Sequence, residues 1–214
     1  WVNFWTGRVQ EGPRRIPVLA PLDQLEAYTS VPLNSLEQSL HGRVMRVRIG
    51  GREHIAQTLD APLLRDGLAE IAELRPKLLA LPRANLHADL FRDNALFDGN
   101  QLAGVIDFYN ACSGPMLYDL AITLNDWCSH EDGSLDGARA RALLGAYAAL
   151  RPFSAAEAEL WPVMLRVACV RFWLSRLIAA ESFAGQEVLI HDPAEFQRRL
   201  AQRQRVELPL PFAL

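Results

Sequence analysis

The stretch HADLFRDN at residues 87–94, followed by IDF at residues 106–108, decides how this chain is interpreted. Three of its polar residues follow one another in the order that matters here: the carboxylate Asp89, the carboxamide Asn94 five residues later, and the carboxylate Asp107. Carboxylate and amide oxygens are the ligands that Mg²⁺ prefers, and a carboxylate can accept the proton of a hydroxyl group. The pattern therefore predicts a phosphoryl-transfer site in which Asp89 orients a hydroxyl and Asn94 and Asp107 hold Mg²⁺.

The residues between the two strings predict a β-hairpin. Two short apolar runs, 95–97 and 102–106, are separated by Asp98-Gly99-Asn100, which is a strong turn signal. A hairpin folded here would bring Asn94 and Asp107 to the same open end, within reach of one divalent ion.

Order and spacing also match the protein-kinase strings H-R-D-L-x-x-x-N and D-F-G, with Ala88 in place of the arginine and Tyr109 in place of the glycine. Each residue has a plainer interpretation when taken singly. Asn94 could cap the turn into the hairpin, and Asp107 could be a turn residue at a strand end. We expect His87 to brace the loop through a backbone hydrogen bond rather than to move a proton.

Two further acidic residues in or near these strings are expected to have structural roles. Asp93 is expected to be a solvated loop residue. Asp119 is expected to be a helix-start or ion-pair residue rather than a catalyst.

Composition limits the function only loosely. The chain has 214 residues, 50% hydrophobic residues and a net charge of −3, which is typical of a globular protein and gives no reason to expect a nucleic-acid partner. Residues 1–10 have neither a basic start nor an apolar run, so no signal peptide is expected. The longest apolar stretch, 161–180, predicts a buried helix rather than a membrane span, because it carries Arg166, Arg171 and Arg176. We expect a cytoplasmic protein with reduced cysteines and no zinc site.

The chain divides into two unequal parts. Residues 1–60 show little helical periodicity, and the part from Arg43 to Ile55 predicts a hairpin around Gly50-Gly51. Residues 61–214 are mainly helical in pattern. Helices are predicted over 63–81 (with Pro76 ending or bending it), over 117–128 and 136–150, after a capping box at Ser154 and Glu157, and after a capping Asp192.

The strings at 86–94, 105–111 (VIDFYNA) and 117–121 (LYDLA) resemble the aminoglycoside-phosphotransferase and choline-kinase superfamily. Within it, residues from about 61 to 214 closely resemble the bacterial homoserine kinases. The resemblance includes FYNAC at 108–112, NDWC at 125–128, RFWLSR at 171–176 and LPFAL at 210–214.

This resemblance implies ATP-dependent phosphorylation of the hydroxyl of L-homoserine, a step of threonine biosynthesis. It implies an α+β, protein-kinase-like fold, of which this chain holds mainly the helical C-terminal lobe with a short catalytic hairpin. Asp89 is then the catalytic base, and Asn94 and Asp107 are the Mg²⁺ ligands. Arg171 and Arg176 are candidates for binding the substrate carboxylate, and helix-surface ion pairs are their alternative role.

The N-terminal part departs from that family. Gly50-Gly51 lacks the spacing of a phosphate-binding glycine loop, and the single lysine, Lys77, lies in a helical or loop segment rather than on a strand. Arg46 or Arg48 on the hairpin could replace the lysine. The N-terminal lobe is therefore expected to be absent, truncated or atypical. Two alternatives stay open: a non-catalytic lobe that binds a ligand or partner, and a kinase for another hydroxylated amine such as an aminoglycoside or choline.

Overall fold

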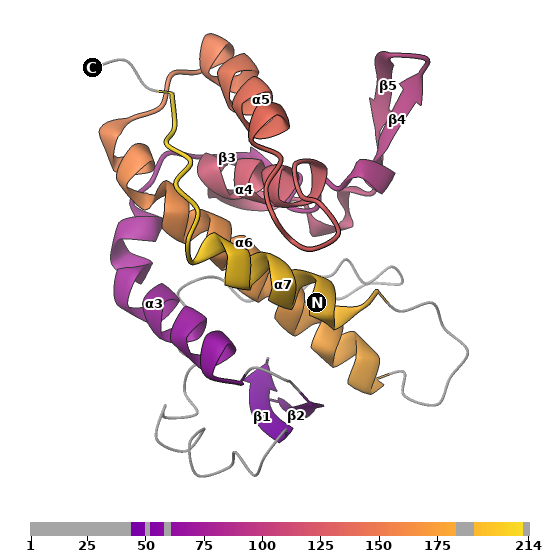
Figure 1. Cartoon of the computed structure of the whole chain (residues 1–214), viewed down its shortest axis with the longest axis vertical. Coiled ribbons are helices and arrows are strands. Elements are labelled where there is room, and N and C mark those ends of the chain that lie inside the picture. The colour runs from indigo at the N-terminus through magenta and orange to yellow at the C-terminus, as the bar shows by residue number, and fades with distance from the viewer. Residues whose placement is uncertain (1–43, 50–51, 58–60, 183–190, 212–214) are drawn as a thin grey trace.

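The computed structural model describes residues 44–49, 52–57, 61–182 and 191–211, which are mostly helical with small antiparallel sheets (Figure 1). The helices are α3 (Ala61–Leu79), α4 (Met116–Trp127), α5 (Gly137–Leu150), α6 (Ala155–Ser182) and α7 (Pro193–Arg203). The strands pair as β1 (Val44–Ile49) with β2 (Arg52–Gln57), β3 (Arg83–Leu86) with β6 (Cys112–Pro115), and β4 (Ala95–Asp98) with β5 (Gln101–Val105). Two short 3₁₀ turns, η2 (Arg92–Asn94) and η3 (Phe108–Asn110), flank the β4–β5 hairpin.

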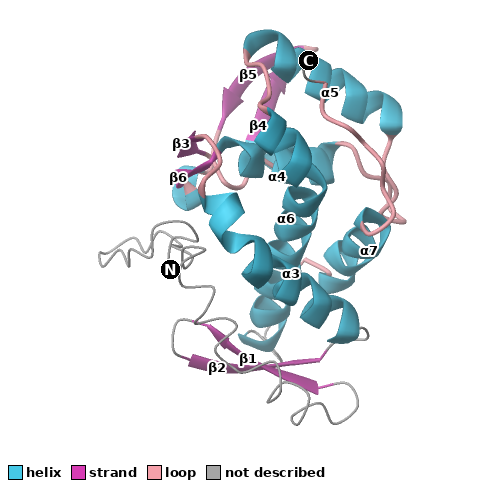
Figure 2. Ribbon diagram, turned by 90° about the vertical axis from the view of Figure 1, so that its left-hand side faces the viewer, coloured by secondary structure: helices cyan, strands magenta, loops and turns pink. Residues whose placement is uncertain are grey.

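Helix α6 is the centre of the fold, packed against α3, α4 and α7 (Figure 2). It contains the apolar stretch that the sequence predicted to be a buried helix, and Trp161 and Trp173 are among its fully buried side chains. The charge of Arg166 is offset by Glu70 of α3, whose Oε2 accepts a hydrogen bond from Arg166 Nε at 2.7 Å. Within the described residues, no helix combines the length and the apolarity that a membrane crossing requires.

The predicted helix starts are confirmed. Ser154 and Glu157 form a reciprocal capping box, in which Glu157 Oε2 accepts from Ser154 N at 2.9 Å and Ser154 Oγ accepts from Glu157 N at 3.3 Å. Asp192 accepts from Ala194 N at 2.9 Å ahead of Pro193, the first residue of α7. Pro76 does not end α3, which continues to Leu79.

Both predicted hairpins are present. The strands β4 and β5 pair around a turn in which Gly99 has a positive φ of 57°, and this hairpin projects from the helical body (Figure 1). Ile106 N donates to Asn94 O at 3.0 Å, which fixes the two ends of the hairpin side by side. The strands β1 and β2 also pair, and their Gly50-Gly51 turn lies outside the described residues.

One pairing was not predicted. Arg83–Leu86, for which no strand was predicted from the sequence, forms β3 and pairs with β6, Leu86 lying opposite Cys112. This pair brings the residues before His87 next to the residues that follow η3. The segment 87–94, here named the catalytic loop, therefore begins and ends on short antiparallel pairs, β3–β6 and β4–β5.

Candidate functional site

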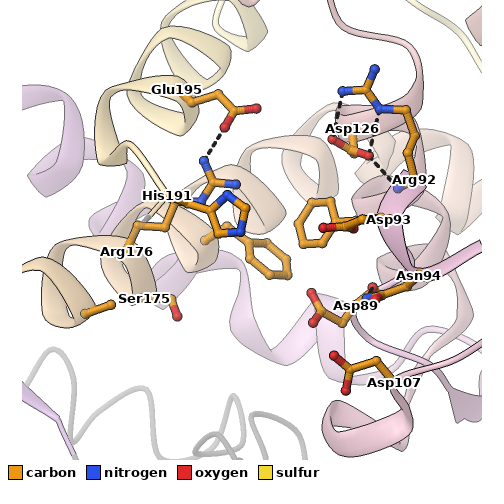
Figure 3. A pocket seen from close by; sticks show the side chains of 13 residues that line it. Asp89, Arg92, Asp93, Asn94, Asp107, Asp126, Ser175, Arg176, His191 and Glu195 are labelled. Atoms are coloured by element: carbon orange, nitrogen blue, oxygen red, sulfur yellow. Dashed lines mark hydrogen bonds and ion pairs between the residues drawn. The ribbon is translucent and has the colours of Figure 1, made fainter. Parts of the chain in front are cut away.

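A cavity of about 540 Å³ opens between the catalytic loop and helices α4, α6 and α7 (Figure 3). Its walls carry acidic and basic side chains together with the phenyl rings of Phe91 and Phe172. The lining residues are Asp89, Phe91, Arg92, Asp93, Asn94, Asp107, Asp126, Phe172, Ser175, Arg176, Ala179, His191 and Glu195.

The structure brings Asp89, Asn94 and Asp107 together on one wall of this cavity (Figure 3). Asp89 lies in the catalytic loop, Asn94 ends η2, and Asp107 lies between β5 and η3. Asn94 Nδ2 donates to the backbone oxygen of Asp89 at 2.8 Å, so the polar atom of this amide that remains for a ligand is its oxygen. The β4–β5 hairpin is the element that returns the chain to this wall, as the sequence indicated.

Two residues beside these groups have left-handed backbone conformations. Ala88 has φ 62° and Asp107 has φ 64°, and neither is glycine. Such conformations cost about 1–3 kcal/mol each and persist only where the surrounding contacts hold them. Because Ala88 directly precedes Asp89, strained backbone determines the direction of the side chains of both Asp89 and Asp107.

Burial raises the pKa of Asp89 to about 6 from an ordinary value of 3.8. The nearby charge of Arg171 and a hydrogen bond from Asn110 Nδ2 to Asp89 Oδ2, at 2.9 Å, act in the opposite direction, while the charge of Asp107 raises the pKa further. Asp89 is therefore a stronger base than an exposed carboxylate and is still mostly ionised at pH 7.

His87 is buried and contacts the segment that carries Asp107. Its Nε2 lies 2.8 Å from the backbone oxygen of Ile106, and its ring packs on Phe108 with 4.6 Å between ring centroids. The side chain thus joins the start of the catalytic loop to both neighbours of Asp107 in the sequence. These contacts agree with the expected bracing role.

Asp119, in the first turn of α4, has a larger role than the sequence suggested. Its two carboxylate oxygens accept hydrogen bonds from the backbone N–H groups of His87, at 2.9 Å, and Ala88, at 2.7 Å. It therefore holds the strained start of the catalytic loop. The helix-start position was correct, but its partners are backbone amides 31 and 32 residues away, which no local pattern indicates.

We expect Asp119→Ala to lower the free energy of unfolding by about 2–4 kcal/mol, because it leaves two partly buried N–H groups without an acceptor. Asp119→Asn keeps one acceptor oxygen and should lose roughly half as much. Urea unfolding measures both, with Asp98→Ala, an exposed carboxylate on the hairpin, as the control. Equal stability of Asp119→Ala and the control would contradict the assigned contacts.

The two candidate substrate arginines lie in different environments. Arg176 lines the cavity, but its guanidinium pairs with the carboxylate of Glu195 and donates to Asp192 O at 3.2 Å. Arg171 is buried and is not among the cavity-lining residues, and its charge lowers the pKa of Asp89. Arg176 therefore forms an ion pair, which is the alternative role expected for these two arginines.

Three contributors to the site were missed in the sequence. Asn110 holds Asp89, while Asp126 and Glu195 line the cavity and bind arginines. Asn110 and Asp126 lie in the strings FYNAC and NDWC, but polar residues in a helix or turn are usually solvated. Asn110 is distinguished only by its hydrogen bond to Asp89, and Asp126 and Glu195 only by the packing of α4 and α7 around the cavity.

The chain is similar in sequence to curated homoserine kinases. The chain is 80% identical over 152 residues to the homoserine kinase of Pseudomonas aeruginosa (strain LESB58). The matched segment makes up 71% of this chain and 48% of that relative. It is 54% identical over 121 residues to the homoserine kinase of Methylobacillus flagellatus, covering 56% of this chain and 38% of the relative. The chain thus spans about half the length of these curated relatives, or less. Among solved structures, an ethanolamine kinase of Plasmodium vivax matches 94% of this chain and 56% of its own, at 15% identity and a TM-score of 0.45.

The family model described as "Phosphotransferase enzyme family" matches residues 19–153. This match is more than half of the chain and includes Asp89, Asn94, Asp107 and Asp119. It also begins well before residue 61, where the sequence pattern becomes helical. The chain belongs to the phosphotransferase enzyme family.

Proposed function

We propose that this chain forms the helical, kinase-like lobe of an enzyme that transfers the terminal phosphoryl group of ATP to the hydroxyl of L-homoserine. The observation that carries the proposal is the gathering of Asp89, Asn94 and Asp107 on one cavity wall, on a loop held by Asp119. The choice of L-homoserine as the substrate is supported by the similarity to homoserine kinases over 71% of the chain. The reaction would serve threonine biosynthesis in the cytoplasm.

The donor set of the site fits Mg²⁺. Asn94 and Asp107 offer an amide oxygen and a carboxylate, which are hard ligands, and the described residues contain no cluster of three or more His, Cys, Asp or Glu side chains suited to a metal. Mg²⁺ is usually held by one or two protein groups together with substrate phosphates and water. When bound, it neutralises charge on the phosphates of ATP.

The residues of the chain would position the substrate hydroxyl and take its proton. Asp89 is the acceptor, and Asn110 fixes its Oδ2, which leaves Oδ1 to face the hydroxyl. The charge of Arg171 favours the ionised form of Asp89 that this role needs. Phosphoryl transfer through a loose transition state depends mainly on such positioning, so a carboxylate held on two sides suits the reaction.

The substrate head group would lie farther along the cavity. Arg176 is the guanidinium on that wall that could bind the α-carboxylate, by exchanging part of its pairing with Glu195. Arg171 is a candidate for the same role from the sequence, and its burial outside the cavity lining together with its charge effect on Asp89 favours an action through Asp89 instead.

For the division of the chain, we propose residues 61–214 as the kinase-like helical C-terminal lobe and residues 1–60 as an atypical or partial N-terminal segment with the β1–β2 hairpin. The family match begins at residue 19, which supports including part of this segment in the phosphotransferase unit.

The decisive experiment is ATP consumption by the purified chain with L-homoserine, choline or an aminoglycoside, each with and without Mg²⁺. We expect turnover that needs both L-homoserine and Mg²⁺. Preference for choline or the aminoglycoside would refute the proposed substrate. Binding of L-homoserine in calorimetry without any turnover would identify a non-catalytic binding lobe instead.

A further inference from the structure

The catalytic loop lies along α4 and is bound at both ends of that helix. Asp119, in the first turn, accepts from the backbone at the start of the loop. At the other end, Trp127 Nε1 donates to Leu90 O at 3.1 Å, and Asp126 Oδ2 accepts from Arg92 N at 2.8 Å. Asp119 and Asp126 are seven residues apart, or about two helical turns, so both side chains reach the same side of α4.

Asp126 takes the place of a missing helix cap. The 3₁₀ turn η2 begins after Phe91, whose side chain makes no capping hydrogen bond. The carboxylate of Asp126 supplies the acceptor from another element, and its negative charge lies at the start of the turn, where free N–H groups favour an anion. The Arg92 side chain adds a second contact, Nε to Asp126 Oδ2 at 3.2 Å.

The same carboxylate connects the loop to α7. Nη2 of the buried Arg199 lies 3.5 Å from Asp126 Oδ1, and the Arg199 guanidinium also pairs with the carboxylate of Glu195. Glu195 in turn pairs with Arg176 on the opposite cavity wall (Figure 3). A continuous row of alternating charges therefore joins the catalytic loop to α7 and α6.

We propose that Asp126 is a positioning residue of the transfer reaction, which seats the loop between Asp89 and Asn94 and does not bind substrate. The proposal rests on the proposed kinase function. Both oxygens of Asp126 already accept from protein donors, and its side chain is only 10% exposed although it lines the cavity. Arg92 lies between Asp89 and Asn94 in the loop, so release of its N–H would let these two groups move relative to each other.

A kinetic comparison separates positioning from binding. In Asp126→Ala we expect kcat to fall about 100-fold with the KM for L-homoserine within about twofold, because misplacement by about 1 Å can cost that much in rate. Asp126→Asn keeps an acceptor for Arg92 N and should recover most of kcat. A raised KM at unchanged kcat in both variants would identify a substrate ligand and overturn the proposal. Asp132→Asn, an exposed carboxylate outside the cavity, is the matched control.

Hydrogen exchange provides a readout that needs no activity. Without substrate, amides of residues 87–94 should exchange at least about tenfold faster in Asp126→Ala than in the wild type, while α5 is unchanged. Arg92→Met, which keeps the backbone bond, should stay close to the wild type. Unchanged exchange over 87–94 in Asp126→Ala would overturn the proposal. Equal acceleration of exchange throughout the chain in both Asp126 variants would also overturn the proposal.

If the wild type has no homoserine turnover, the proposed function fails, and exchange alone decides whether Asp126 holds the loop.

Discussion

Asp107→Ala is expected to abolish homoserine-dependent ATP turnover, with a loss of at least about 10³-fold in kcat. Asp107 is the carboxylate of the proposed Mg²⁺ pair, and without it the pair is reduced to the neutral amide of Asn94. We expect that raising the Mg²⁺ concentration does not restore turnover, because the carboxylate is needed to position the metal and the phosphate and not only to raise the affinity for Mg²⁺. The measurement is steady-state ATP consumption across a Mg²⁺ titration.

Two further variants separate charge from backbone conformation at this position. Asp107 has φ 64°, a region that asparagine tolerates better than alanine, so Asp107→Asn keeps the conformation and an oxygen while it removes the charge. We expect it to be nearly as inactive as Asp107→Ala. Asp98→Ala, on the same hairpin but outside the cavity-lining set, should keep wild-type turnover. Wild-type turnover in either Asp107 variant would show that the proposed metal site is wrong.

The features that the sequence predicted correctly are those that depend on neighbouring residues. The β4–β5 hairpin follows from a turn between two short apolar runs, and the cap at Asp192 follows from an acceptor two residues before the N–H that it binds. These interactions close short loops, so their sequence signal is complete within a few residues. The predicted meeting of Asn94 and Asp107 is of this kind, because a single hairpin lies between them.

Features formed by distant contacts could not be predicted in the same way. Asp119 and Asp126 bind loop amides more than 30 residues away, and in a helix pattern they resemble solvated polar positions. The pairing of β3 with β6 also depends on contacts between distant residues. Cys112–Pro115 shows neither alternation of polar and apolar residues nor β-branched residues, so its sequence does not predict a strand. The strained φ of Ala88 is likewise a result of the contacts on both sides of it.

The orientation of α6 limited the prediction of substrate contacts. This helix is apolar almost all round, so its pattern does not indicate which side faces the cavity. Arg171 and Arg176 could not be distinguished from the sequence, although Arg171 is buried outside the cavity lining and Arg176 lines the cavity. The deciding partner of Arg176, Glu195, lies on α7 and reaches it only in the folded chain.

The second variant with a large expected effect is Asp89→Asn, which should reduce kcat at least about 10³-fold while it stabilises the fold. The amide cannot accept the hydroxyl proton, but its oxygen can still accept the hydrogen bond from Asn110 Nδ2. Turnover is measured as for Asp107. Activity within tenfold of the wild type would exclude Asp89 as the proton acceptor.

The gain in stability follows from the sign of the pKa change. Burial raises the pKa of Asp89 from 3.8 to about 6, so the folded wild type binds a proton more tightly than the unfolded chain does. Its stabilising contribution is complete below pH 3.8 and is lost as the pH rises through about 6, so ionised Asp89 costs at most about 3 kcal/mol at pH 7. Asp89→Asn removes that cost, and urea unfolding should show the variant to be more stable at pH 7 and nearly equal at pH 4. Asp98→Asn, an exposed control, should show no such difference. An equal effect of Asp89→Asn at both pH values would mean that Asp89 is not held ionised against burial. A site that loses stability to keep one carboxylate charged is expected where that charge serves catalysis.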